Sequence, residues 1–426
     1  MPRNTLESII YYAMIVMVFT CFFNFLCEAA VSRDKINTGE KFPVVLVPGL
    51  GGSRIYYRDK NDPSGSMHRL WLNFRHIFDI SRLIQLLRCN QPTGIGNFHS
   101  LQYDESTQKT IDKADVEIIV PGWGDTWTIE HLDEDEYFIG AEFSAIVEEL
   151  TKDPFFIRNV SVRGTPYDFR RTPTENQQVL HRMKQLVEET YKLNGQRKIV
   201  LVAHSLGTIY SFEFLKLQTA AWKSKYIKAF VSISGPFGGT VKATNALTSG
   251  EAFPLHIPNP FKLRNLFRTL PSVGFLLPDP RFWPANEPIV TTPERNYTAN
   301  DVQQLFIDIG FPQGYDMWLH NPKQSDYLEG PTNVENVYCV YGTQIQTLEK
   351  VVYLPQGIFR KPFPDQIPTH VYGNGDGTVN LRSLQVCNKW PNVNLTELPG
   401  AQHLETLQDK RLLKLINEIT GAEPSQ

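Results

Sequence analysis

The chain has 426 residues, of which 41% are hydrophobic and 20% are charged, and its formal net charge is −3. This length fits one large domain with insertions or two domains, because single domains usually run to about 250 residues. The composition predicts a globular protein. The slightly negative charge gives no electrostatic support for a nucleic-acid partner.

Residues 1–30 predict a secretory signal peptide. Arg3 precedes an uncharged apolar run over 9–27, and Ala29 and Ala30 follow as a small-residue cleavage site. The run is also just long enough to span a bilayer, so an uncleaved anchor is the alternative. Either form delivers the rest of the chain to the secretory pathway.

Sequons and cysteines agree with that route. Three acceptor sequons for N-glycosylation begin at Asn159, Asn296 and Asn394. The third is the weakest, since it lies in an expected strand. The cysteines beyond the apolar run are Cys89, Cys339 and Cys387. An oxidising compartment predicts one disulfide and one unpaired thiol among them, and the spacing alone leaves the pair open.

The first strand is expected within 41–52, KFPVVLVPGLGG, an apolar run that ends in a Pro-Gly turn and a glycine pair. Such an exit loop lets the backbone approach a ligand closely. Because of its place ahead of the turn described below at Ser205, we expect an oxyanion hole here, with the backbone N–H of Leu50 as donor. The alternative is an ordinary strand with a flexible loop.

Residues 56–96 leave the strand rhythm. From His68 onward, aromatic and aliphatic residues recur at helical spacing. A core-facing helix would explain this pattern. The position directly after the expected oxyanion loop favours an amphipathic excursion that contacts a membrane.

Strands and helices then alternate. We expect a strand at 115–123, a helix at 141–150, a strand at 159–163 and a helix opened by a capping box at 174–177. The cluster at 167–171, Tyr-Asp-Phe-Arg-Arg, carries enough charge to be catalytic. An ion-paired loop anchor is the more usual role of such a cluster, and we assign it that role.

The stretch 199–207, IVLVAHSLG, predicts a strand, a sharp turn and a helix. In a nucleophile elbow the serine lies at the tip of a strained turn, so small residues are needed two positions before and after it. Here those residues are Ala203 and Gly207, which makes Ser205 the expected nucleophile.

The alternation continues with a strand at 228–234 and breaks after Gly239. Residues 244–330 are rich in Pro, Phe and Leu without clear strands, which predicts a cap or lid. The pattern resumes with strands at 335–342, 369–372 and 394–398 and a closing helix at 404–419. Such alternation predicts a mostly parallel sheet with helices on both faces.

A serine nucleophile needs a histidine base and a carboxylate that orients the base. Asp376 follows an expected strand and is flanked by glycines, and His403 lies between the last strand and the last helix. The order Ser205, Asp376, His403 is that of α/β-hydrolases. Asp168 precedes the serine and His204 points away in such turns, so both are weaker candidates. We expect no metal and no cofactor, because no metal-ligand spacing, phosphate-binding loop or dinucleotide fingerprint occurs.

With these residues placed, the chain resembles the lecithin:cholesterol acyltransferase family, and within it the lysosomal branch. The matching stretches include VVLVPG (44–49), RLWLN (69–73), GTPYDFRR (164–171), VLVAHSLG (200–207), IDIGF (307–311), GNGDGTVNLRSL (373–384) and LPGAQH (398–403). The matches cover nearly all of the chain after residue 40, in the expected order.

The resemblance implies an α/β-hydrolase core made of 31–55, 97–243 and 331–426, with 56–96 as a membrane-binding excursion and 244–330 as cap and lid. It implies a triad of Ser205, Asp376 and His403, an oxyanion hole formed by the N–H groups of Leu50 and Leu206, and a disulfide between Cys339 and Cys387. Two departures stand out. The lysosomal branch has Asp in place of Leu50, and the family's N-terminal disulfide needs a cysteine before Trp71 that this chain lacks.

The implied activity is acyl hydrolysis and transacylation on glycerophospholipids, with the acyl group passing to water or to a lipid alcohol such as ceramide. The implied partners are a phospholipid membrane surface and that acceptor, and the implied location is the lysosome, with secretion as the alternative. A sterol or diacylglycerol acyltransferase is one competing hypothesis. A lipid-binding protein with an inactive site is the other.

Overall fold

The computed structural model describes residues 39–71, 99–113, 115–133, 140–251, 261–321 and 327–423. The expected signal peptide, Cys89 and residues 72–96 of the expected excursion lie outside these ranges. The chain divides into two units, Met1–Lys41 and Phe42–Gln426, and every described helix and strand belongs to the second. Within the described residues, no helix has both the length and the apolar character that a bilayer crossing requires.

A six-stranded sheet lies at the centre of the second unit, in the order β15-β12-β9-β8-β1-β7. Its strands are β1 (Val44–Val47), β7 (Val162–Gly164), β8 (Ile199–His204), β9 (Ile227–Ile233), β12 (Asn336–Thr343) and β15 (Val393–Pro399). All neighbouring strands are parallel. β1 and β8 are buried over their whole length, as expected for strands that are apolar on both faces.

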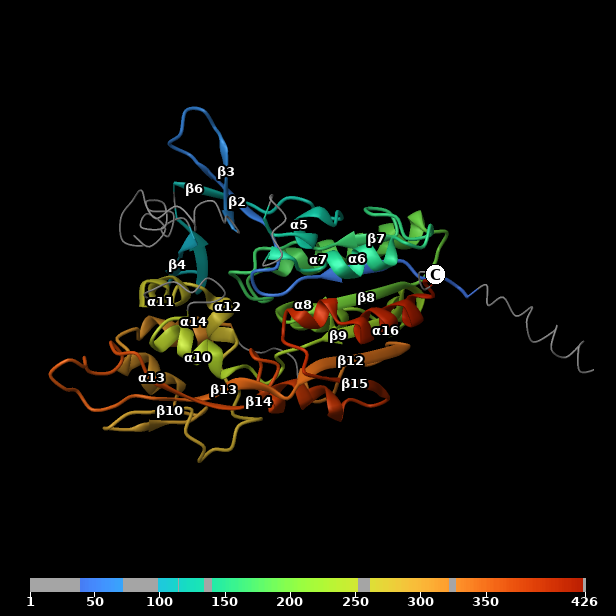
Figure 1. The fold of residues 1–426 in the computed structure, drawn as a ribbon. Helices are drawn as coiled ribbons and strands as arrows, with labels where there is room; N and C mark the ends of the chain where they lie inside the picture. Colours follow the sequence, from blue (N-terminus) through green and yellow to red (C-terminus); the bar gives the residue numbers. More distant parts are fainter. Residues whose placement is uncertain are drawn as a thin grey trace, which may run out of the picture. The chain divides into compact units, whose positions relative to one another are not determined.

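Helices cover both faces of this sheet (Figure 1). Because successive side chains of a strand point to opposite faces, β1 contributes to two hydrophobic cores. Val45 and Val47 pack in one core with α7 (Gln177–Leu193) and α8 (Leu206–Lys216), and Val44 and Leu46 pack in the other with α6 (Ser144–Leu150) and α16 (Lys410–Thr420). The predicted α/β-hydrolase fold class is therefore confirmed.

Two strands that the alternation placed in the α/β core lie elsewhere. β6 (Val116–Ile119) pairs antiparallel with β2 (Ile55–Asp59), which also pairs with β3 (Met67–Trp71). β14 (Thr369–Gly375) pairs antiparallel with β13 (Ile345–Val352). Both displaced strands carry polar residues or glycine between their apolar ones and are partly exposed. This pattern suits an antiparallel sheet with one wet face rather than a buried parallel strand.

Two local predictions are also wrong. The helical spacing expected from His68 onward fails at 68–71, because these residues form β3 in a hairpin with β2. The capping box expected at 174–177 does not open the helix, because α7 begins at Gln177. Asn176 is the N-cap residue of α7 and makes no capping bond with its side chain. Its amide instead donates to the carbonyl of Asp168 and the hydroxyl of Tyr210, each at 2.9 Å.

The described parts of 244–330, here called the cap, contain helices joined by turns and two short strands. They contain most of α10 (Val241–Thr248), then α11 (Phe261–Phe267), α12 (Pro271–Phe275), α13 (Val302–Asp308) and α14 (Gln313–Leu319). Cap residues such as Phe275, Trp283 and Phe306 are buried in the same core as Val45. The cap strands β10 (Val290–Thr291) and β11 (Asn296–Tyr297) extend the sheet of β13 and β14. The cap is therefore packed against the α/β core through a continuous apolar interior.

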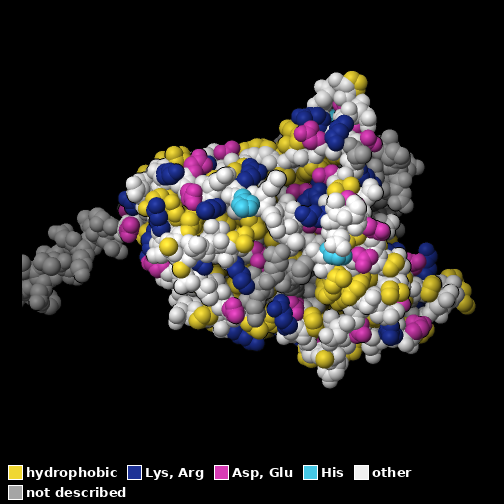
Figure 2. Space-filling model, turned by 180° about the vertical axis from the view of Figure 1, so that it is seen from behind, with side chains coloured by type: hydrophobic (Ala, Val, Ile, Leu, Met, Phe, Trp, Pro, Cys, Tyr) yellow, Lys and Arg dark blue, Asp and Glu magenta, His cyan; other side chains and the backbone are white. Residues whose placement is uncertain are grey.

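The remaining elements are short. They are the hairpin β4 (Leu101–Asp104) and β5 (Lys109–Asp112), helices α5 (Trp127–Glu130), α9 (Ala220–Tyr226) and α15 (Leu381–Leu384), and the 3-10 helices η2 (Gln385–Lys389) and η3 (Glu405–Gln408). Acidic and basic side chains are intermixed over the face seen in Figure 2. That distribution matches the small net charge.

Candidate active site

Ser205 lies at a strained turn between β8 and α8. Its φ and ψ are +51° and −125°, a conformation that residues with side chains rarely adopt and that is often found at functional sites. Gly207 permits the turn, because a Cβ at that position would lie 2.4 Å from the carbonyl oxygens of Val47 and Pro48. The amide of Ser205 donates to the carbonyl of Ile233 on β9 at 2.9 Å. The serine is thus held above the end of the parallel sheet, as the motif predicted.

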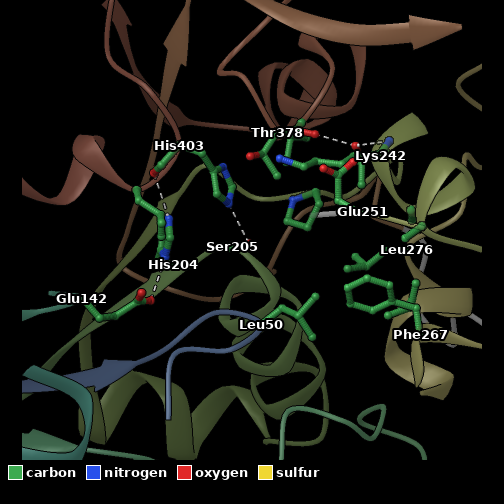
Figure 3. Close-up of a pocket in the computed structure, with 17 residues that line it drawn as sticks. Leu50, Glu142, His204, Ser205, Lys242, Glu251, Phe267, Leu276, Thr378 and His403 are labelled. Atoms are coloured by element: carbon green, nitrogen blue, oxygen red, sulfur yellow. Dashed lines mark hydrogen bonds and ion pairs between the residues drawn. The ribbon is translucent and has the colours of Figure 1, made fainter. Parts of the chain in front are cut away.

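The structure brings the predicted serine, histidine and aspartate together (Figure 3 shows the first two). Ser205 Oγ lies 2.9 Å from His403 Nε2, and His403 Nδ1 lies 2.7 Å from Asp376 Oδ2. Ser205 lies at the elbow, Asp376 in the loop after β14 and His403 in the loop after β15. The backbone N–H of His403 also donates to the carbonyl of Asp376 at 2.8 Å, which fixes the second and third loops to each other.

Asp376 is completely buried, yet it is equipped to remain ionised. Burial by itself would raise its pKa. The charge of His403, the hydrogen bond from that ring and the backbone N–H groups of Val379 and Thr378 outweigh burial and bring the pKa below its usual value. The two N–H groups donate to Oδ1 at 2.7 and 3.0 Å, which leaves Oδ2 for the histidine.

The loop after β1 lies against the elbow. A Cβ at Gly49 would come within 2.9 Å of the Ser205 Cβ, so glycine is needed for this close approach. The hydroxyl of Tyr167 donates to the carbonyl of Pro48 at 2.8 Å and holds the loop in place. Leu50 follows in this loop and lines the same pocket as the serine, while Leu206 begins α8 directly after the serine. The two residues expected to donate backbone N–H groups therefore flank Ser205.

Sequence reasoning missed Glu142, a buried acid just before α6. Its Oε1 accepts from the backbone N–H of Gly49 at 3.3 Å and lies 3.0 Å from His204 Nδ1. The other nitrogen of His204, Nε2, lies 3.1 Å from the carbonyl oxygen of His403. His204 points away from the serine as expected, and it links the loop after β1 to the backbone of the histidine beside Ser205 (Figure 3). The sequence carried no signal for Glu142, because the bond to His204 joins residues 62 positions apart.

A pocket opens beside Ser205 and His403. Its far wall is apolar and comes mainly from the cap, through Ala246, Phe267, Val273 and Leu276, with Ala243 of α10 just before the cap. Lys242, Glu251 and Thr378 add polar groups to the wall. Burial lowers the pKa of Lys242, and the charges of Glu251 and Asp376 oppose that shift. Because the far wall is apolar and the pocket reaches Ser205, the space suits a long apolar group whose reacting end lies against the serine.

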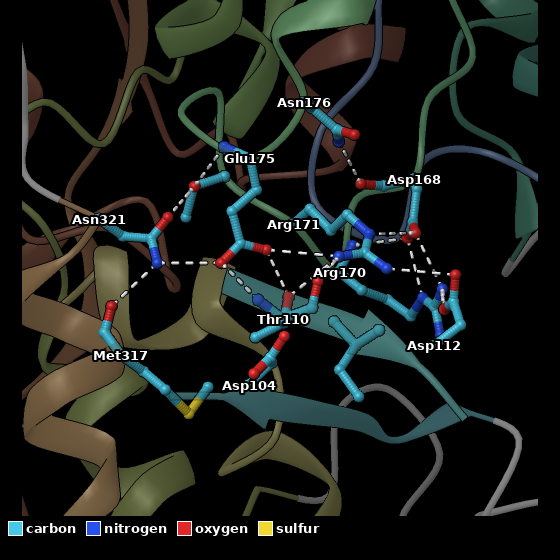
Figure 4. Close-up of polar contacts among 12 residues, drawn as sticks. Asp104, Thr110, Asp112, Asp168, Arg170, Arg171, Glu175, Asn176, Met317 and Asn321 are labelled. Atoms are coloured by element: carbon cyan, nitrogen blue, oxygen red, sulfur yellow. Dashed lines mark hydrogen bonds and ion pairs between the residues drawn. The ribbon is translucent and has the colours of Figure 1, made fainter. Parts of the chain in front are cut away.

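The cluster at 167–171 is an ion-paired anchor, as predicted (Figure 4). Buried Arg170 pairs with Asp168 at 2.8 Å and with Asp112 of the β4–β5 hairpin at 2.6 Å. Arg171 pairs with Glu175 at 3.5 Å, and Asn321, at the end of α14 in the cap, donates to the same carboxylate at 3.1 Å. The cluster joins a hairpin, the loop after β7 and the cap, and none of its residues lines the pocket beside Ser205.

The remaining predicted sites lie away from the pocket. Cys339 and Cys387 form a disulfide between β12 and η2. Asn159, Asn296 and Asn394 are exposed. The amide nitrogen of Asn394 donates to the carbonyl of Val337 at 3.2 Å, which makes it the least favoured acceptor of the three. The described residues contain no group of side chains that could hold a metal ion.

Comparison with known proteins finds relatives that match nearly the whole chain. The family model described as Lecithin:cholesterol acyltransferase matches residues 68–330 and 313–410. The chain is 35% identical to "Lysosomal phospholipase A and acyltransferase" of Canis lupus familiaris, over 93% of this chain and 95% of the relative, and 35% identical to the Homo sapiens protein of that name, over 91% and 93%. It is 30% identical to "Phosphatidylcholine-sterol acyltransferase" of Gallus gallus, over 92% and 94%. The structure titled "The crystal structure of Tle4-Tli4 complex" aligns more loosely, over 90% of this chain and 99% of that chain, at 12% identity and a TM-score of 0.49.

Proposed function

Because the chain belongs to the lecithin:cholesterol acyltransferase family, whose matched relatives are phospholipid acyl hydrolases and acyltransferases by name, we propose that it cleaves acyl esters of glycerophospholipids with Ser205, Asp376 and His403 as catalytic triad. The protein is an enzyme, a serine acyl hydrolase and transacylase. One observation carries the assignment of residues. An unbroken chain of short contacts runs from Ser205 Oγ through His403 to buried Asp376, at the mouth of an apolar pocket.

The geometry suggests how these residues act. Ser205 Oγ attacks the ester carbonyl while His403 Nε2 takes the hydroxyl proton, and Asp376 holds the ring in orientation. The oxyanion of the tetrahedral intermediate accepts from the N–H groups of Leu50 and Leu206, and removing one such donor typically raises the barrier by roughly 3 kcal/mol. When the intermediate collapses, His403 gives its proton to the leaving glycerol oxygen.

The second half-reaction releases the acyl group from Ser205. Water or the hydroxyl of a lipid alcohol attacks the acyl-enzyme, His403 takes the proton of that hydroxyl, and the serine leaves with the proton restored. Ceramide is the proposed acceptor besides water. The apolar cap wall of Phe267, Val273 and Leu276 supports a lipid acceptor, because such a surface retains alkyl chains better than it retains water.

Replacing Ser205 with alanine tests the assignment. Ser205→Ala should lower fatty-acid release from phosphatidylcholine vesicles by about 10⁶-fold, since the acyl-enzyme cannot form. It should also abolish labelling by a fluorophosphonate probe. Ser211→Ala, in the helix that follows, is the control for loss of a buried hydroxyl and should retain both signals. Normal turnover in the Ser205 variant would refute the assignment.

Two competing functions remain distinguishable. A sterol or diacylglycerol acyltransferase would transfer labelled acyl chains to those acceptors when vesicles contain ceramide, sterol and diacylglycerol in equal amounts. A lipid-binding protein with an inactive site would take up phospholipid without forming either fatty acid or acylated acceptor. We expect fatty acid and acylated ceramide as the main products.

The proposed route is the secretory pathway, with the lysosome as destination and secretion as the alternative. The Cys339–Cys387 disulfide supports an oxidising compartment, and the names of the mammalian relatives support the lysosome. Glycosylation is proposed at Asn159 and Asn296, with Asn394 less favoured. Removal of N-glycans from the secreted or lysosomal protein should increase its mobility on a gel. Unchanged mobility would contradict the proposed glycans.

A further inference from the structure

The loop between β13 and β14 carries the most exposed large apolar side chains among the described residues. Ile358 is 95% exposed and Phe359 is fully exposed. Gly357 and Arg360 close a tight turn around them, since the N–H of each donates to the carbonyl of the other at 3.1 Å. Ile358 and Phe359 are therefore the two central residues of that turn. In Figure 1 the orange loop that joins β13 to β14 projects past the cap helices.

The base of the loop is tightly organised. Gln366 is buried, and its amide nitrogen donates to the carbonyls of Leu354 and Lys361 at 2.8 and 2.9 Å. Its amide oxygen accepts from the backbone N–H of Leu354 at 3.2 Å. Phe363 packs edge-on against Tyr353, with 4.7 Å between ring centroids. The fold thus holds the turn of Ile358 and Phe359 out in solvent instead of letting it collapse onto the cap.

The same loop is fastened to the wall of the pocket. Arg264 of α11 pairs with Asp365 at 2.8 Å and donates to the carbonyl of Pro364 at 3.3 Å. Phe267, at the end of the same helix, lines the pocket beside Ser205. A single helix therefore connects the exposed turn to the space that receives the acyl chain.

The chemistry of the turn matches one kind of surface. Two adjacent apolar side chains at the tip are followed by the exposed cations Arg360 and Lys361. At a phospholipid interface, apolar side chains enter the acyl region while Lys and Arg remain among the phosphates, and each cation adds attraction to anionic lipid. We propose that the tip, defined as Ile358–Lys361, inserts into anionic phospholipid membranes and holds the pocket wall of α11 at the bilayer.

This proposal rests on the proposed function, because a membrane anchor beside the pocket serves an enzyme whose substrate is a lipid. It concerns a different segment from the excursion expected at 56–96. The occupant is a lipid surface and not a second copy of the chain, since the two cations beside the apolar pair would face the same two cations across a symmetric contact.

Vesicle co-sedimentation of the full chain tests the tip. The double variant Ile358→Ser/Phe359→Ser should bind vesicles of phosphatidylcholine with about 20 mol% phosphatidylglycerol roughly tenfold or more weakly than the wild type. Arg360→Gln/Lys361→Gln should lose the preference for these vesicles over pure phosphatidylcholine. Leu217→Ser, at the end of α8, is the control because it removes a side chain that is 64% exposed outside the loop.

Two activity measurements accompany binding. Hydrolysis of p-nitrophenyl butyrate in solution should be unchanged in the Ile358/Phe359 variant, which shows that its site is intact. The vesicle concentration that gives half-maximal phospholipid hydrolysis should rise at unchanged maximal rate. Equal vesicle binding by variant and wild type would overturn the proposal. A lower sedimentation coefficient for the variant than for the wild type, both measured without vesicles, would also overturn it, because it would reveal that the wild type self-associates through the tip. A wild type that hydrolyses neither p-nitrophenyl butyrate nor phospholipid would contradict the proposed function but not the membrane tip, because vesicle binding is measured without turnover.

Discussion

Glu142 and His204 satisfy each other only if the pair holds a shared proton. His204 Nε2 faces a carbonyl oxygen, so it must carry hydrogen, and Nδ1 faces a carboxylate oxygen that already accepts from Gly49. The proton between Nδ1 and Oε1 can belong to either group, and in both cases all three hydrogen bonds form. A glutamine at position 142 could not provide this arrangement. Its amide oxygen could accept from both Gly49 N–H and His204 Nδ1 only if His204 carried a proton on each nitrogen. The imidazolium would then be buried without the negative charge of Glu142 to balance it.

We therefore expect Glu142→Gln to lower kcat/KM by roughly 10- to 100-fold through misplacement of the Gly49 loop and of His403. The measurement is kcat/KM for ester hydrolysis, with Glu148→Gln on the exposed side of α6 as control. The control should keep the wild-type value. An unchanged kcat/KM in the Glu142 variant would contradict a positioning role for the pair.

The elbow shows how an element depends on a single missing side chain. Gly207→Ala would place a Cβ 2.4 Å from two carbonyl oxygens of the β1 exit, so the strand–turn–helix unit cannot form without displacing β1. We expect little soluble protein and no fluorophosphonate labelling. Gly274→Ala in α12 is the matched control, because nothing lies within 4 Å of its Cβ position. That control should fold and gain about 0.5–1 kcal/mol in free energy of unfolding. A Gly207 variant with normal stability in urea would contradict the steric argument.

Sequence patterns predicted those elements whose physics is local. β1 and β8 are almost entirely apolar, and β9 and β12 are mostly buried strands. The elbow, Asp376 and His403 could be placed by their order and by the loops that carry them. The assignments of β6 and β14 failed because a short mixed strand does not reveal its partner. The pair of Glu142 and His204 could not be found either, since neither residue belongs to a repeating pattern and their contact depends on how α6 packs beside β8.

At the scale of the whole molecule, the cluster around Arg170 ties the β4–β5 hairpin to the loop after β7. Burial raises the pKa of Asp168. The charges of Arg170 and Arg171 lower it by more than burial raises it, so the pKa lies below its usual value. A carboxyl whose folded pKa is depressed stabilises the protein above its unfolded pKa, and this stabilisation disappears as the pH falls through the folded value. The contribution should therefore be complete at about pH 5 and diminish below about pH 4.

We expect Asp168→Asn to reduce the free energy of unfolding at neutral pH by roughly 3 kcal/mol, because it leaves the buried Arg170 with Asp112 as its remaining ion-pair partner. The difference from the wild type should shrink at about pH 3.5, because the carboxyl of the unfolded chain, with a pKa of about 3.9, is then largely protonated. Urea unfolding at both pH values measures it. Glu335→Gln removes partly exposed pairs with Lys198 and Lys228 and should cost less than about 1 kcal/mol. A constant difference across pH would contradict an ionic origin.

The distance along the chain between Ser205 and its proposed base, His403, has a consequence for biosynthesis. His403 follows the serine by 198 residues, and Asp376 also comes from the later part of the chain. A nascent chain that has reached only β9 contains the complete elbow but no group that can activate it. If the chain is translocated beside a membrane made of its own substrate, the enzyme stays inactive until its last strand and loop have emerged and folded. With the proposed triad and the proposed secretory route, the separation delays activity until synthesis is complete and so protects the membrane that the chain crosses.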